Sequence, residues 1–179
     1  MRAYVLGVGR MGTAIAYAMD KFGFHVIGMD TNPDAAENIP LKVNHEQSKD
    51  ENGNSAFGSP NNEFFLVKDA ADICKGLEAQ VKPDVVISSL PYHQTEIVGK
   101  WCVENGVRYC DLGGRVDVSQ NINDHAKAKA TKPVFTDLGL APGWVNILAE
   151  HGCKKVHSQI DSVKMMVGGL PAIPKNPPF

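Results

Sequence analysis

The chain has 179 residues, of which 43% are hydrophobic and 21% charged, as expected for one globular domain. With a net charge of −2 and no run of Lys or Arg longer than two residues, it lacks the basic patches that bind nucleic acid or membrane surfaces. No apolar run approaches the ~20 residues that span a bilayer, so we expect a cytoplasmic protein.

Short apolar runs alternate with segments of helical period along the chain. The expected strands are Ala3–Val8, His25–Asp30, Glu63–Val67, Asp84–Leu90, Arg108–Leu112, Pro133–Leu138 and Ser162–Val167. The expected helices are Met11–Phe22, Asp69–Ala79, Gln94–Asn105, Val118–Ala130 and Trp144–Cys153. Because most strands are continuously apolar, both faces of their sheet should be covered. The sequence therefore predicts an α/β fold with a doubly wound, mostly parallel sheet and three αβα layers.

Two segments interrupt this alternation. Residues 43–62 are polar and occupy the place of the helix between the second and third strands, and Pro40 is expected to end a short helix just before them. Residues 171–179 contain four prolines and read as an extended tail. Residues 1–170 are expected to form the domain itself.

A G-x-G-x-x-G pattern, Gly7, Gly9 and Gly12, lies between the first strand and the first helix. The first glycine permits a tight turn, the second lets the backbone approach a pyrophosphate, and the third lets the helix pack against the strand. The pyrophosphate is expected on the free N–H groups of that helix, beside Arg10 and Met11. This context predicts a Rossmann-type dinucleotide-binding domain.

Asp30 ends the second strand, 23 residues after Gly7. It is expected to accept hydrogen bonds from the ribose hydroxyls and to repel a 2′-phosphate, and no Arg or Lys follows it directly. We therefore expect NAD rather than NADP. The alternatives are a structural glycine turn with Asp30 as a helix cap and Arg10 as a surface residue, or a site for another nucleotide such as S-adenosylmethionine.

Distinctive residues follow the fourth, fifth and sixth strands, at the edge of the sheet where ligands of open α/β folds bind. Two D-L-G repeats each place an acid at a strand end and a glycine two residues later. Small or rigid residues at this edge are expected to let the main chain contact the nicotinamide. The expected cofactor-lining residues here are Ser89, Leu90, Pro91, Gly113, Gly139 and Pro142.

The segments LGVGRMG, SSLPYH, VRYCDLGG, VFTDLGLAPGWVNILAEHG and SVKMMVGGLPAIP together resemble the amino-terminal half of the saccharopine dehydrogenase-like family, and most of all its lysine 6-dehydrogenase branch. This resemblance implies an NAD(P)-dependent oxidoreductase that acts on a carbon–nitrogen bond of an amino acid or related amine. It also implies a second domain after GGLP that closes over the nicotinamide. Since the chain ends at Phe179, we expect a cofactor-binding half that is inactive alone, with an uncovered apolar face that favours a homo-oligomer. A catalytically silent NAD-binding module is the competing reading.

The implied reaction oxidises an amine to an imine, and a base must first deprotonate the ammonium. His93 is the candidate base, with Tyr92 orienting the substrate. Asp111 and Asp137 either hold the cationic amine or accept backbone N–H bonds at their turns, and His93 has the alternative of a surface position. The four cysteines and six histidines show no metal-ligand spacing, so no metal is expected.

Overall fold

A computed structural model describes residues 1–39 and 62–168 of the chain. The sheet has six parallel strands in the order β3-β2-β1-β4-β5-β6, which is the strand order of a Rossmann fold and confirms the predicted fold class. Their bounds are β1 Arg2–Leu6, β2 His25–Asp30, β3 Glu63–Leu66, β4 Val85–Ser88, β5 Arg108–Asp111 and β6 Val134–Phe135. The tail at 171–179, Pro40 and the polar insert (except Asn62) lie outside the described residues.

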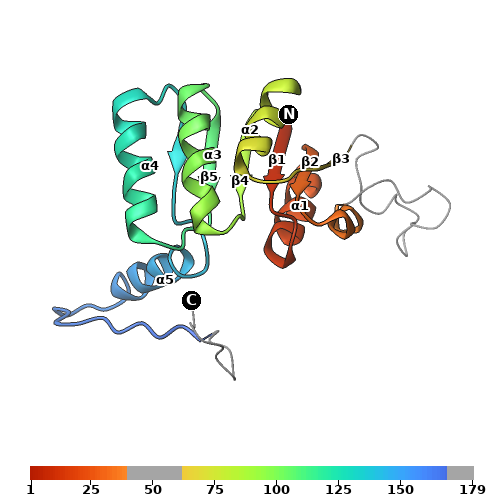
Figure 1. Cartoon of the computed structure of the whole chain (residues 1–179). Coiled ribbons are helices and arrows are strands. Elements are labelled where there is room, and N and C mark those ends of the chain that lie inside the picture. Colours follow the sequence, from red (N-terminus) through yellow and green to blue (C-terminus); the bar gives the residue numbers. More distant parts are fainter. Residues whose placement is uncertain (40–61, 169–179) are drawn as a thin grey trace, which may run out of the picture.

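The helices cover the sheet as the chain order requires. Their bounds are α1 Arg10–Lys21, the short 3-10 helix η1 Pro33–Asn38, α2 Ala70–Ala79, α3 Tyr92–Glu104, α4 Val116–Lys129 and α5 Trp144–Cys153. Helices α2, α3 and α4 stand side by side over one face (Figure 1), whereas α1 and η1 pack on the other. Among the helices that the structure describes, none is long and apolar enough to cross a bilayer.

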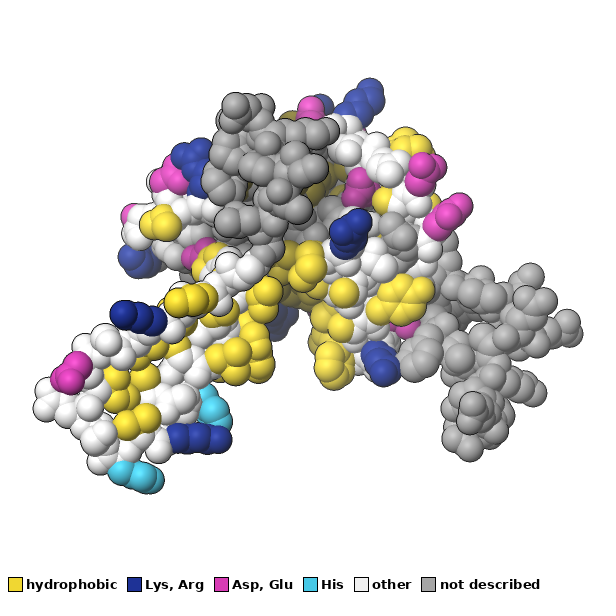
Figure 2. Space-filling view, turned by 90° about the horizontal axis from the view of Figure 1, so that it is seen from below, with side chains coloured by type: hydrophobic (Ala, Val, Ile, Leu, Met, Phe, Trp, Pro, Cys, Tyr) yellow, Lys and Arg dark blue, Asp and Glu magenta, His cyan; other side chains and the backbone are white. Residues whose placement is uncertain are grey.

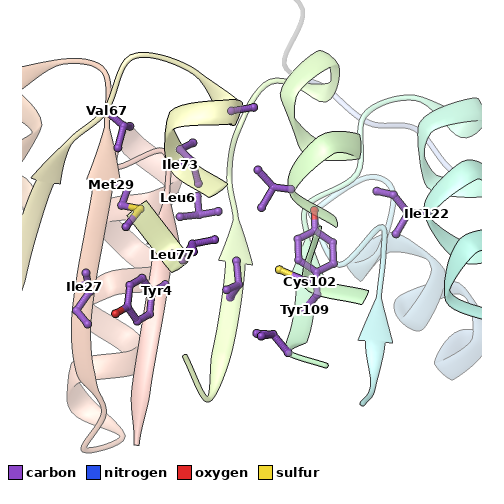
Figure 3. Close-up of a cluster of buried hydrophobic side chains, with 14 of the residues drawn as sticks. Tyr4, Leu6, Ile27, Met29, Val67, Ile73, Leu77, Cys102, Tyr109 and Ile122 are labelled. Atoms are coloured by element: carbon purple, nitrogen blue, oxygen red, sulfur yellow. The ribbon is translucent and has the colours of Figure 1, made fainter. Parts of the chain in front are cut away.

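Two hydrophobic clusters hold these layers together. The larger one joins alternate side chains of β1 and β2, such as Tyr4 and Met29, to α2, α3 and α4, as Figure 3 shows. The smaller one packs Val5 and Val26 against α1 and η1 on the opposite face. Successive β1 residues therefore enter different clusters, as expected for a strand that is buried on both faces.

Two helix ends follow the capping signals in the sequence. The Asp69 carboxylate accepts the backbone N–H of Asp72 at 2.9 Å and so caps α2. Gly106, with φ +60°, ends α3, and the N–H of the following Val107 donates to the Cys102 carbonyl at 2.9 Å. The start predicted for α2 at Asp69 and the end predicted for α3 at Asn105 thus agree with the structure within one residue.

The main differences from the predicted elements lie at the C-terminal end of the described chain. Ser162–Val167 was expected as a strand, but it is irregular and exposed, so this prediction is wrong. The segment has no strand partner within the described residues, and a strand needs one to satisfy its backbone. The sixth strand is also shorter than predicted, because the chain after Phe135 turns into a loop.

Helix α5 has no buried side chain and lies below the sheet in Figure 1. Trp144, Ile147 and Leu148 are each at least 50% exposed. Figure 2 views the molecule from the side on which α5 lies and shows hydrophobic side chains gathered there. The apolar side chains of α5 are therefore left uncovered by the described part of the chain.

Candidate functional site

A cleft of about 410 Å³ opens at the C-terminal ends of β1, β2 and β4. From β1 the chain adds strands β2 and β3 on one side of the sheet, and then β4, β5 and β6 on the other side. Open α/β sheets bind their ligands at the point between β1 and β4 where this direction changes. The cleft is lined by Gly7, Gly9, Arg10, Met11, Asp30, Thr31, Val67, Ile73, Ser89, Leu90, Pro91 and Gln94.

The glycine loop is compact because two of its glycines face other backbone groups. Gly7 has φ +78°, and its carbonyl accepts the Ser89 hydroxyl at 2.9 Å. A Cβ atom on Gly12 would overlap the carbonyl oxygen of Gly7. Gly12 therefore lets α1 start directly above β1, which is the packing role predicted for the third glycine.

Gly9 has a different environment and forms the N-cap of α1. A Cβ atom built there would have no neighbour within 4 Å, so the space above this residue is open. No side chain caps this end of the helix in the described part of the chain, where the carbonyl of Gly9 accepts the N–H of Thr13 at 2.8 Å. The first N–H groups of α1 and the positive end of its dipole are thus directed at the open space. A phosphate group suits this position.

The Asp30 carboxylate stands at the other side of the glycine loop. One oxygen accepts the N–H of Val8 at 2.5 Å, and the other accepts the N–H of Asn32 at 2.9 Å. These bonds hold the carboxylate at the lip of the cleft. Each oxygen keeps a second lone pair, so the group can still accept two hydroxyl donors.

Most residues predicted around the cofactor line this cleft, and four further ones were missed. Thr31 follows Asp30 directly, and Val67 follows β3, so both lie at the predicted edge of the sheet. Ile73 and Gln94 come from the first turns of α2 and α3. Their position depends on the angle at which each helix leaves the sheet, which the sequence does not specify.

Tyr92 and His93 lie next to the cleft without lining it. Helix α3 begins two residues earlier than predicted, so both side chains belong to its first turn and directly follow Pro91. Their rings meet edge to face at 5.7 Å, and the Arg115 guanidinium lies 5.1 Å from the Tyr92 ring centre. His93 is exposed, and its Nε2 lies 3.4 Å from the Gln94 amide nitrogen.

Asp111 is buried, with 2% of its surface exposed. Its Oδ1 accepts the N–H of Gly113 at 2.8 Å and that of Asp137 at 3.0 Å. Burial raises the pKa of the Asp111 carboxyl above its usual value, although both N–H donors act to lower it. Of the two roles considered for Asp111, this geometry matches acceptance of backbone N–H bonds at turns.

The remaining predicted lining residues, Gly113, Gly139 and Pro142, do not line the cleft. A Cβ atom on Gly113 would overlap the Asp137 carboxylate, and one on Gly139 would overlap the carbonyl of Leu112. These glycines therefore let the β5–α4 and β6–α5 loops pack against each other. Contact of these residues with a nicotinamide ring stays a prediction.

A comparison with protein-family models matches residues 3–136 to the saccharopine dehydrogenase NADP-binding domain. The match covers the glycine loop, Asp30 and the loop after β4. Within the described residues, no group of three or more His, Cys, Asp or Glu side chains is placed to hold a metal ion.

Solved structures with the same fold include two dehydrogenases. Saccharopine dehydrogenase (L-Glu forming) from Saccharomyces cerevisiae superposes with a TM-score of 0.60 at 18% identity, over 87% of this chain and 31% of that one. The WlbA dehydrogenase from Bordetella pertussis, solved with NADH and UDP-GlcNAcA, gives 0.54 at 14% identity, over 86% and 42%. The chain thus spans less than half the length of either protein, and at these identities the likeness concerns the fold.

Proposed function

Since the chain belongs to the saccharopine dehydrogenase NADP-binding domain family, we propose that its cleft binds NAD in preference to NADP. The bound cofactor serves an oxidoreductase that acts on a carbon–nitrogen bond of an amino acid or related amine. Within the family, the lysine 6-dehydrogenase branch is the proposed relationship. The chain spans 31% of the length of the yeast enzyme, so this reaction is proposed for the whole protein.

The observation that carries the proposal is the placement of Asp30 relative to the glycine loop. The hydrogen bond from Val8 to Asp30 places the carboxylate beside the turn that leads to the phosphate position at α1. An adenosine ribose next to a pyrophosphate at α1 would present its two hydroxyls to this carboxylate. A 2′-phosphate would bring a second negative charge to the same place, which favours NAD.

Arg10 is the one basic residue that lines the cleft among the described residues. As the first residue of α1, it accompanies the pyrophosphate in this proposal. Replacement of Arg10 by Ala is therefore expected to weaken NADH and NADPH binding by similar factors. A selective loss of NADPH binding would instead assign Arg10 to the 2′-phosphate.

His93 and Tyr92 are the proposed catalytic pair, because they follow the cleft residue Pro91 directly. His93 removes a proton from the substrate ammonium, and Tyr92 orients the substrate. Asp111 positions the neighbouring loops. Since His93 is exposed, and hydride transfer needs a site closed to water, we expect the 179-residue chain to bind cofactor without measurable oxidation of lysine.

Titration of the 179-residue chain with NADH and NADPH, followed by nicotinamide fluorescence, tests the cofactor proposal. We expect tighter binding of NADH than of NADPH. Asp30→Asn should weaken NADH binding about tenfold and lower the ratio of NADH to NADPH affinity. The matched control is Asp34→Asn on η1, an exposed acid that does not line the cleft. Tighter binding of NADPH, or an Asp30→Asn variant with unchanged affinities, would contradict the proposal.

A further inference from the structure

Gln94 places an uncharged amide in the lining of the cofactor cleft. It is the third residue of α3, and its side chain is half-buried. Its Oε1 atom is shielded from solvent but accepts no hydrogen bond within the described part of the chain. Because nearly all buried acceptors in folded proteins are satisfied, this oxygen is suited to a donor that a ligand supplies.

The nitrogen of the same amide already has a neighbour. It lies 3.4 Å from Nε2 of His93, which accepts one of the two amide N–H groups when the imidazole carries its proton on Nδ1. Turning the nitrogen into the cleft would give up this neighbour, whereas turning the oxygen into the cleft gives up no hydrogen bond. The carbonyl is therefore the end of the Gln94 amide that is left for a ligand.

The backbone of Gln94 is held firmly in the first turn of α3. Its N–H donates to the Pro91 carbonyl at 2.9 Å. The buried hydroxyl of Thr95 lies 3.2 Å from the Leu90 carbonyl and so ties this turn to the loop after β4. The last torsion of a glutamine side chain is broad, so Oε1 can turn toward the cleft while the helix stays in place.

The adenosine end of the cofactor is the end that Gln94 faces, if the proposed function holds, and the inference rests on it. The N–H of Val67 donates to the Asp30 carbonyl at 3.0 Å, so Val67 lies directly beside the acid assigned to the ribose. Val67 and Ile73 are buried apolar side chains that line the cleft. Helices α2 and α3 stand side by side (Figure 1), so Ile73 and Gln94 approach the cleft from the same side. A flat base attached to that ribose suits this apolar surface, with Gln94 at its edge.

Only some groups of a dinucleotide suit a carbonyl acceptor. The pyrophosphate offers acceptors alone, which the Oε1 atom of Gln94 would repel. The ribose hydroxyls are assigned to Asp30, and the nicotinamide carboxamide belongs to the other end of the cofactor. The 6-amino group of adenine is the donor that remains, and glutamine amides recognise adenine through it.

We propose that Gln94 selects adenine as the base of the cofactor by accepting a hydrogen bond from the 6-amino group at Oε1. Hypoxanthine and guanine carry a carbonyl oxygen at this position, which would face the Gln94 carbonyl. A site that pairs with a donor rejects an analogue without it, because its own polar group is then left unpaired. The proposed function concerns the ribose and its 2′-phosphate, and Gln94 adds recognition of the base.

The test titrates the full chain with NADH and with reduced nicotinamide hypoxanthine dinucleotide, followed by nicotinamide fluorescence. The two cofactors differ in the base, where a carbonyl oxygen replaces the 6-amino group. We expect NADH to bind more tightly by about fivefold or more. Equal affinities would overturn the inference and leave the proposed function standing. Absence of NADH binding would overturn both.

Two variants assign the selectivity to Gln94. Gln94→Met keeps the length of the side chain without the acceptor, so the two affinities should come within about twofold of each other. Gln94→Glu keeps an acceptor at this position and should retain the preference for NADH, although its charge weakens the binding of both cofactors. Gln120→Met, at an exposed position on α4 outside the cleft, is the matched control and should keep the wild-type ratio. A wild-type ratio in Gln94→Met, or a ratio near one in Gln94→Glu, would overturn the assignment.

Discussion

The carboxylate of Asp111 accepts the backbone N–H of Asp137 across the two loops that follow β5 and β6, at 3.0 Å. The N–H of Leu138 donates in turn to the Asp111 carbonyl at 2.8 Å. The first D-L-G repeat thus binds the backbone of the second. Because a buried acid joins these loops, its protonation affects stability.

The pH dependence of stability should reveal the state of Asp111. Since burial raises its pKa in the folded chain above the usual 3.8, the folded state binds more protons there than the unfolded state as pH falls. The wild type should therefore gain stability relative to Asp111→Asn when the pH is lowered from 7 towards 4. Urea denaturation at several pH values measures this difference. The opposite slope would show that the N–H bonds outweigh burial.

Removal of the whole Asp111 carboxylate should lower the free energy of unfolding more than Asp111→Asn does. Asp111→Ala leaves the N–H groups of Gly113 and Asp137 without this partner, and we expect a loss of about 2–4 kcal/mol in the free energy of unfolding. Asp111→Asn, which keeps one acceptor oxygen, is the matched comparison. Equal stabilities of the two variants would show that these bonds contribute little.

In the glycine loop between β1 and α1, replacement of Gly9 and of Gly12 by alanine should have different effects. Gly9→Ala finds open space and should change the free energy of unfolding by less than about 1 kcal/mol, yet its methyl group should reduce NADH affinity at least tenfold. Gly12→Ala should lower stability by about 3 kcal/mol or more, because its Cβ atom overlaps the Gly7 carbonyl. Thermal unfolding and NADH titration separate the two effects. Gly152→Ala, at an open position in α5, is the control, and retained NADH affinity in Gly9→Ala would contradict the placement of the pyrophosphate.

The preference for NADH over NADPH should be reversible by changes at Asp30 and Thr31. Thr31 lines the cleft, so Thr31→Arg combined with Asp30→Ser removes the repelling charge and adds one that pairs with a 2′-phosphate. We expect the ratio of NADPH to NADH affinity to rise at least tenfold. Thr31→Ser with Asp30→Ser controls for loss of the acid alone. An unchanged ratio would place the adenosine ribose elsewhere.

The thiols should differ in reactivity. Burial raises the pKa of Cys74 and of Cys110 to about 11 and raises that of Cys102 further. At pH 7.5 less than about 0.1% of Cys74 and Cys110 is thiolate, so iodoacetamide should label Cys153 on α5 first in the folded chain. Peptide mass spectrometry checks this order, with Cys153→Ser as control. Faster labelling of Cys74 or Cys110 would indicate that this part of the fold opens.

The glycine loop and two of the helix ends were predictable because local sequence specifies them. Gly7 has a positive φ of +78° that few other residues adopt, and Gly12 allows a close approach of α1 to Gly7 that a side chain would prevent. The capping acid Asp69 and the terminating Gly106 mark the ends of their helices. The prediction of a strand at Ser162–Val167 was wrong because strand formation also depends on a partner elsewhere in the chain. An apolar run becomes a strand when another strand is present to pair with it.

The amino-acid sequence by itself determined the parallel α/β fold, the glycine loop and the acid that faces it, because periodicity and backbone freedom are local properties. The tertiary structure alone decided that Gly113 and Gly139 serve loop packing, that Asp111 is buried, and that Asp137 lines a cavity separate from the cofactor cleft. These features arise where loops from different strands meet. Their contacts depend on how far each loop folds over its neighbour, a distance that neither loop encodes alone.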